Sequence, residues 1–239
     1  MGIAEEPDGK NYIHFNAFFT RALKGSARSF SRVSTDIICP VDGSISQIGS
    51  ISNGTIFQAK NRSFMLKDLL ANDAALTGDF NEGEFVTLYL SPRDYHRVHM
   101  PFDGTLRKMI YVPGRLFAVN RHTTAVVNRL FSRNERVICI FDTVIGPMAL
   151  ILIGAIFVGS METVWAGEIT PASVRSATLT DYDDQSNPIT YEKGEEIGRF
   201  NMGSTVIILY AKDRIHWLEG LGSGDLVKMG MTIGTSHIS

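Results

Sequence analysis

Short apolar runs separated by turn-forming residues are the feature that most limits how this chain can fold. The runs are rich in Val, Ile, Leu and Phe, and Gly, Pro, Asn or Asp stands between several of them. Such runs are typical of β-strands. We place them at residues 41–51, 54–59, 85–90, 104–111, 137–141, 148–158, 164–169 and 206–210. The sequence predicts an α+β fold, a mostly antiparallel β-sheet core with a few short helices, in a single domain spanning residues 1–239.

Local signals predict how some of these elements connect. Asn53-Gly54 tolerates the positive φ angles of tight hairpin turns, so we expect it to join the strands at 41–51 and 54–59. Ser63 can cap a short helix that runs through Leu70. The segment 178–196 is polar and turn-rich, which predicts an exposed excursion. The carboxyl end, residues 225–234, is expected to form a final hairpin.

Composition and charge narrow the classes of function. The formal net charge is -2, which argues against nucleic acid as a partner because polyanion binders carry an excess of Lys and Arg. The longest apolar stretch, residues 147–158, is shorter than the ~20 residues of a spanning helix and predicts a buried strand. Cys39 and Cys139 lie in apolar, strand-like surroundings, which favours two reduced core cysteines.

An amphipathic helix is predicted near the amino terminus. In residues 14–24, Phe15, Phe18, Phe19 and Leu23 recur at helical spacing. The apolar stripe could dock on the core or face a membrane, and the first reading is the more common one for such helices. We therefore treat residues 1–30 as a helical lead-in for which both readings stay open.

Asp42, His99 and Ser204 are the candidate catalytic residues. A carboxylate, an imidazole and a hydroxyl are the three groups needed to activate a serine, which is otherwise a poor nucleophile. Ser204 follows Gly203 directly before a predicted strand, where the unshielded Gly203 carbonyl can be attacked. The structural alternatives are a turn-forming Asp42, an ordinary strand His99 and a strand-edge Ser204. Because a triad is defined by geometry, sequence order alone does not decide between them.

His96 and His99 form a His-x-x-His pair. In a strand the two would face opposite sides, so we expect a turn or helical bend after Pro92 that lets both reach one cavity. The pair could also bind a metal, but no nearby Cys, Asp or Glu pattern completes a credible zinc set, and no metal site is predicted.

Several long, irregular blocks of the sequence resemble the phosphatidylserine decarboxylases of bacterial type, a pyruvoyl-dependent family. The most recognisable block is Leu-Ser-Pro-Arg-Asp-Tyr-His-Arg-Val-His-Met-Pro at residues 90–101. Further similar blocks lie at residues 110–114, 130–136, 159–167 and 198–200. Met202-Gly203-Ser204-Thr205 is similar to the family's Leu-Gly-Ser-Thr signature, with Met202 in place of the leucine, an exchange that conserves volume. The resemblance spans nearly the whole chain.

The resemblance implies that the chain cuts itself at Gly203-Ser204. His99, oriented by Asp42, would take the Ser204 hydroxyl proton, and the alkoxide would attack the Gly203 carbonyl to replace the peptide bond with an ester. Elimination across Cα and Cβ of Ser204 would then release a β chain of residues 1–203 and leave a dehydroalanine at the head of residues 204–239. Water would hydrolyse its imine tautomer to a pyruvoyl group with loss of ammonia, which completes the α chain.

The resemblance also implies the reaction and its remaining residues. The covalent pyruvoyl cofactor would serve as electron sink for the decarboxylation of phosphatidylserine to phosphatidylethanolamine, with Thr205 beside it. His96 would reprotonate the intermediate, since imidazole titrates near neutral pH. Arg93 and Arg97 could bind the lipid phosphate, or else pair with Asp94 or another part of the fold.

The setting follows from the same resemblance. We expect a phospholipid substrate at a membrane surface and a homodimer of processed protomers, bound peripherally to the cytoplasmic side of a bacterial cell membrane. The alternative function is a serine hydrolase that uses Asp42, His99 and Ser204 on an ester or amide substrate. That alternative predicts an intact chain, whereas the family reading predicts two chains.

Overall fold

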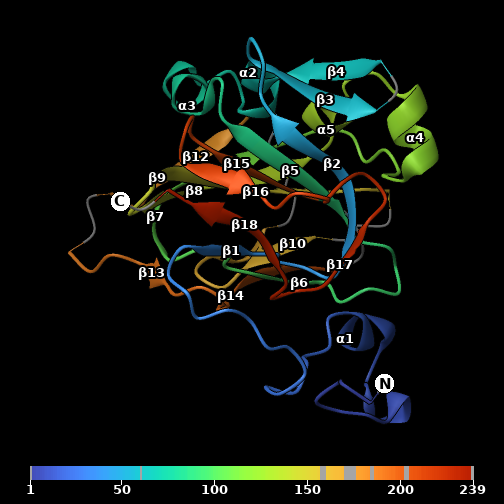
Figure 1. The fold of residues 1–239 in the computed structure, drawn as a ribbon. Coiled ribbons are helices and arrows are strands. Elements are labelled where there is room, and N and C mark those ends of the chain that lie inside the picture. The colour runs from blue at the N-terminus through green and yellow to red at the C-terminus, as the bar shows by residue number, and fades with distance from the viewer. Residues whose placement is uncertain are drawn as a thin grey trace.

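Most of the apolar runs assemble into one large antiparallel sheet, seen at the centre of Figure 1. The structure is a computed structural model, and it describes residues 2–59, 61–156, 160–169, 176–183, 186–201 and 205–237. The strand order is β12, β7, β8, β9, β15, β5, β2 and β17, with β13 also paired to β7. Their bounds are β2 Gly43–Ser50, β5 Glu84–Tyr89, β7 Gly104–Val112, β8 Arg136–Thr143, β9 Gly146–Ile153, β12 Thr178–Asp181, β13 Thr190–Tyr191, β15 Thr205–Tyr210 and β17 Leu226–Val227.

β15 is the most deeply buried strand of this sheet. It pairs with β9 on one side and β5 on the other, and all six of its residues are buried. An uninterrupted apolar run is what a strand covered on both faces requires. The predicted α+β fold with a mostly antiparallel sheet core is therefore confirmed.

Three smaller sheets complete the described strands. One has the order β11 Gly167–Ile169, β10 Met161–Thr163, β14 Glu196–Phe200 and β6 Arg97–His99. Another has the order β1 Asp36–Ile38, β18 Thr232–Ser236 and β16 Ile215–Trp217. The third pairs β3 Thr55–Ala59 with β4 Arg62–Met65. In Figure 1 the sheet with β3 and β4 lies at the opposite end of the molecule from the N-terminus.

The helices are short. They are η1 Gly9–Asn11, α1 Phe15–Phe19, α2 Leu66–Leu69, α3 Ala74–Phe80, α4 Arg121–Val126 and α5 Leu130–Arg133. The predicted amphipathic helix at 14–24 is thus reduced to α1, whose His14 side chain caps it and whose Thr20 ends it. Among the described residues, none of the helices has the length and apolar content that crossing a bilayer would require.

Two predictions for the segment after β2 were wrong: the hairpin between residues 41–51 and 54–59, and the helix start at Ser63. Asn53 and Gly54 do form the turn, with φ values of 51° and 64°, but β2 and β3 share only the isolated Ser52–Thr55 bridge. β2 pairs instead with the apolar strand β5, which buries more apolar surface than the half-exposed β3 offers. Ser63 lies in β4 rather than at a helix start, because residues 62–65 alternate in burial and pair with β3; α2 begins at Leu66.

Later in the chain, non-local pairing again overrides local pattern. Residues 164–169 are not one strand: the chain turns after β10, and Gly167, with φ of +70°, starts the return strand β11. The final segment is not a hairpin, since β17 pairs with β2 and β18 with β1 and β16. β9 ends at Ile153, short of the predicted 158. The polar excursion is exposed as expected, and its strands β12 and β13 pair with β7 and form that edge of the sheet.

Candidate active site

The predicted cleavage bond lies in the connection between two strands that the structure describes, β14 and β15. Gly203 and Ser204 themselves lie outside the described residues, as does Met202. On the amino side, β14 ends at Phe200, whose amide donates to the carbonyl of His96 at 3.0 Å. On the carboxyl side, Thr205 begins β15 between Tyr89 of β5 and Ile153 of β9, and it is 1% exposed. Two different sheets therefore hold the residues on either side of the segment that contains the bond.

His99 has a defined tautomer. Its Nδ1 donates to the carbonyl of Gly194 at 2.8 Å, since a carbonyl oxygen can only accept. Its Nε2 is then the lone-pair nitrogen and accepts from the Tyr95 hydroxyl at 2.9 Å. Burial lowers the pKa of His99, which favours the neutral ring. Gly194 is needed at this position because a Cβ there would lie 2.4 Å from the ring of Phe30.

Asp42 lies at the start of β2 with its carboxylate buried. The Arg28 guanidinium forms two hydrogen bonds to it, through Nε to Oδ1 at 3.2 Å and through Nη2 to Oδ2. The Met229 amide donates to Oδ1 at 2.9 Å, and the Lys228 ammonium lies 3.4 Å from Oδ2. Both carboxylate oxygens are therefore bonded to groups that sequence reasoning did not identify.

The structure brings Asp42 and His99 together without a hydrogen bond between their side chains. The His99 amide donates to the carbonyl of Pro40 at 3.0 Å, which ties β6 to the chain just before Asp42. Burial is the largest effect on the pKa of His99 and lowers it, while the Gly194 carbonyl, the Glu196 charge and, more weakly, the Asp42 charge raise it. Asp42 therefore contributes only a small part of the electrostatic environment of His99, and Gly194 fixes the ring.

His96 lies in a different environment from His99. Its ring is fully buried, packs on Phe19 with the ring centroids 3.9 Å apart, and donates from Nδ1 to the Asp94 carbonyl at 2.8 Å. Burial lowers the pKa of His96 to about 4, so the ring is neutral at neutral pH. Its Nε2 is buried and has no hydrogen-bond partner among the described residues.

The expected turn after Pro92 is present. Asp94 closes it by accepting from the amide and the hydroxyl of Ser91 at 2.8 and 2.7 Å. The turn precedes His96, so the two histidines still diverge, one toward Phe19 and the other toward Tyr95. The carboxylate of Asp94 is engaged within the turn.

The two predicted phosphate ligands differ in their surroundings. Arg97 donates to Glu196 at 2.8 Å and to the carbonyl of Thr20 at 2.8 Å, which is the pairing with the fold that we gave as the alternative. Arg93 is exposed in the turn. Neither lines the cavity beside Thr205 described next.

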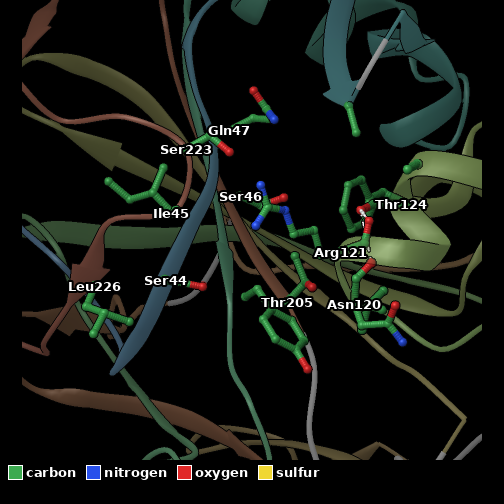
Figure 2. Close-up of a pocket in the computed structure, with 16 residues that line it drawn as sticks. Ser44, Ile45, Ser46, Gln47, Asn120, Arg121, Thr124, Thr205, Ser223 and Leu226 are labelled. Atoms are coloured by element: carbon green, nitrogen blue, oxygen red, sulfur yellow. Dashed lines mark hydrogen bonds between the residues drawn. The ribbon is translucent and has the colours of Figure 1, made fainter.

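A cavity of about 390 Å³ opens beside Thr205, between β2 and α4 (Figure 2). Figure 2 shows Ser44, Ser46 and Arg121 extending into this space from its two walls. Its polar lining consists of Ser44, Ser46, Gln47, Tyr89, Asn120, Arg121, Thr124, Thr205 and Ser223. Of these, sequence reasoning had singled out Thr205 alone.

Comparison with known proteins identifies similar chains along nearly the whole length. The family model for phosphatidylserine decarboxylase matches residues 15–235. The phosphatidylserine decarboxylase proenzyme of Pseudomonas putida strain GB-1 is 54% identical over 234 residues, covering 98% of this chain and 81% of the relative. The proenzyme of Ectopseudomonas mendocina strain ymp is 52% identical, covering 100% of this chain and 83% of the relative. That of Azotobacter vinelandii strain DJ is 51% identical, with coverages of 100% and 82%.

Proposed function

This chain belongs to the phosphatidylserine decarboxylase family, and from that premise we infer that it forms its own active site by cleavage between Gly203 and Ser204. The chain is a proenzyme whose processed form converts phosphatidylserine to phosphatidylethanolamine and carbon dioxide. The agreement with proenzymes over nearly its whole length carries this conclusion. The comparisons do not support the serine hydrolase alternative. Purified protein supplied with phosphatidylserine should release carbon dioxide and form phosphatidylethanolamine, whereas a hydrolase would release fatty acid or free serine.

His99 is the base of the cleavage step. Its Nε2 carries the lone pair because Gly194 holds the proton on Nδ1, and Nε2 takes the hydroxyl proton of Ser204. The Tyr95 hydroxyl holds the ring in place through Nε2 and yields that position to the serine hydroxyl. The neighbouring Asp42 carboxylate then stabilises the positive charge that forms on the ring.

Arg28 positions the Asp42 carboxylate for this role. A buried carboxylate needs paired partners, and the Arg28 fork bonds both of its oxygens. Lys228 contacts the same carboxylate from a more exposed position, with its side chain 59% exposed against 16% for Arg28.

Replacing Arg28 by glutamine should slow self-cleavage by about 10- to 100-fold, because a charge-assisted bidentate contact to Asp42 is lost. The rate is measured on denaturing gels after refolding. Guanidinium chloride added at low millimolar concentration should restore part of the cleavage rate of Arg28→Gln, because it can replace the lost guanidinium. The matched control, Lys228→Gln, removes the more exposed contact to Asp42 and should slow cleavage only a few-fold. A rate in Arg28→Gln equal to wild type would remove Arg28 from the mechanism.

The fold can retain both products of the cleavage. β15, which follows the cleaved bond, is held between β9 and β5 of the amino-terminal chain. β17 and β18 likewise pair with β2 and β1. The α and β chains therefore stay associated through the sheets after the bond is cut.

The residues around Thr205 fit a pyruvoyl group made from Ser204. Thr205 is paired on both sides in the sheet and lines the cavity, and the pyruvoyl group would be joined to its amide. The pyruvoyl group supplies a ketone that accepts the electron pair left when carbon dioxide departs. The chain contributes a buried acceptor that has no partner among the described residues, His96 Nε2, on a residue directly before β6 whose carbonyl accepts from the Phe200 amide.

His96 transfers the proton that completes the reaction. Because its ring is neutral, Nε2 first accepts a proton from the substrate ammonium. It then returns that proton to the substrate carbon from which carbon dioxide has left. The contact with Phe19 and the bond to the Asp94 carbonyl hold the ring in one orientation for both transfers.

The amino-terminal segment attaches the enzyme to the membrane surface. Ile13 and Phe15 are 94% and 62% exposed and lie close together in a segment that also contacts His96 through Phe19. Insertion of these side chains into the membrane–water interface would bring the lipid headgroup close to the active site. As the resemblance implies, the processed protomers form a homodimer on the cytoplasmic side of a bacterial cell membrane.

Replacing both Ile13 and Phe15 by serine should weaken binding to vesicles of phosphatidylglycerol and phosphatidylethanolamine by about 10²- to 10⁴-fold, since each apolar side chain contributes ~1.5–3 kcal/mol when fully buried. Binding is measured by vesicle sedimentation. The matched control is Val144→Ser, at a side chain 82% exposed in the β8–β9 turn, which should bind as wild type does. Equal loss in both variants would contradict the assignment.

A further inference from the structure

The cavity beside Thr205 contains a guanidinium that the cleavage and proton-transfer steps do not use. Arg121 lies at the start of α4, is exposed, and has no side-chain hydrogen bond or ion pair among the described residues. Among the described residues that line the cavity, none is acidic. An arginine facing a cavity without a neutralising carboxylate leaves a positive potential there, which favours an anionic ligand.

The opposite wall supplies hydroxyl donors. Ser44 and Ser46 lie on β2, and the pairing of β2 with β5 shifts between Ile45 and Gln47, so that Ser46 is the bulged residue. Bulges of this kind re-aim side chains beside functional sites. Figure 2 shows Ser46 and Arg121 pointing toward one another across the cavity. A guanidinium facing hydroxyls suits the tetrahedral, multiply accepting oxygens of a phosphate group.

The position of the cavity matches the shape of the substrate. In the serine headgroup, four bonds separate the amine from the phosphorus, so the two groups are about 5 Å apart at typical bond lengths. The phosphate must therefore bind close to the group joined to Thr205, and Thr205 lines this same cavity. The volume of about 390 Å³ suits a headgroup with its phosphate, and the tails would remain outside.

We propose that Arg121, with Ser44 and Ser46, binds the phosphodiester of the substrate lipid. This assignment rests on the proposed function, and it names the residues that bind the phosphate of the substrate in that reaction. It replaces the earlier candidate Arg97, whose guanidinium is occupied by Glu196 and the Thr20 carbonyl.

The test uses processed enzyme and dioctanoyl phosphatidylserine in mixed micelles. Arg121→Gln should raise KM by about 10- to 100-fold, the loss expected for a charge-assisted contact, while kcat stays within about threefold. Arg121→Lys keeps the charge and should recover most of the affinity. The matched control is Arg129→Gln, which removes an exposed arginine that lies outside the cavity and contacts Asp68. Complete self-cleavage in each variant reports that it is folded.

A second arm separates the lipid from free phosphate. Inorganic phosphate should inhibit wild type competitively and Arg121→Gln much more weakly. An unchanged KM in Arg121→Gln overturns the proposal. If KM is unchanged but inhibition by phosphate still depends on Arg121, then Arg121 binds an anion at a site separate from the substrate, and the proposal is again overturned. Failure of the wild-type chain to cleave or to release carbon dioxide would instead refute the proposed function.

Discussion

The chain with Ser204 replaced by alanine should stay in one piece and should form no phosphatidylethanolamine. Without the hydroxyl there is no nucleophile to attack the Gly203 carbonyl, so the cleavage rate should fall by at least ~10³-fold, and the pyruvoyl group cannot form. The measurement is a denaturing gel time course of freshly refolded protein, together with carbon dioxide release. Wild type should resolve into residues 1–203 and 204–239.

A control substitution at another serine shows whether the loss of cleavage comes from the missing Ser204 hydroxyl or from misfolding. Ser52 is exposed in the turn after β2, and Ser52→Ala should cleave at the wild-type rate. Near-ultraviolet circular dichroism compares the folds of the two variants. Cleavage of folded Ser204→Ala at a rate near wild type would show that another residue makes the break.

Replacing His96 by glutamine should separate maturation from catalysis. Cleavage should proceed because His99 and its partners Gly194 and Tyr95 are untouched. Decarboxylation should fall by about 10²- to 10⁴-fold, the usual contribution of a positioned acid–base group. Carbon dioxide release is measured on the fully cleaved protein. His99→Gln should behave in the opposite way and remain uncleaved.

The pH dependence gives a second readout for His96. Burial lowers its pKa to about 4, so the free enzyme carries a neutral ring from about pH 5 upward. Since kcat/KM reports ionisations of the free enzyme, its profile should show no limb from His96 between about pH 5 and 8. Full decarboxylation by cleaved His96→Gln would assign the proton transfer to another group.

The sequence predicted the centre of the fold because its signals there are local and strong. The run 206–210 is apolar throughout, and it became the buried central strand β15. The pairing of shorter segments could not be predicted, because it depends on residues far away in the chain. β2 is followed by a turn suited to a hairpin with β3, yet it pairs with β5, and β17 pairs back to β2. Local turn chemistry sets where a chain reverses, while burial decides which strands pair.

The partners of the candidate residues escaped prediction for the same reason. Arg28 meets Asp42 only through the fold, and the group that fixes His99 is the backbone carbonyl of Gly194, which has no sequence signature. Tyr95 stands inside the recognisable 90–101 block and could have been noticed as a donor near His99. Arg121 gave no signal, since only the bulge at Ser46 and the placement of α4 make it face a cavity.

The most direct test of the account is the intact mass of freshly purified protein under denaturing conditions. Self-cleavage at Gly203-Ser204 should give two species, residues 1–203 and residues 204–239, the second lighter by one ammonia than a fragment that begins with serine. Borohydride should add hydrogen to the second species alone, because only its terminus carries a ketone. A single species with the mass of the uncut chain, from protein that is folded and unreactive to borohydride, would contradict the account.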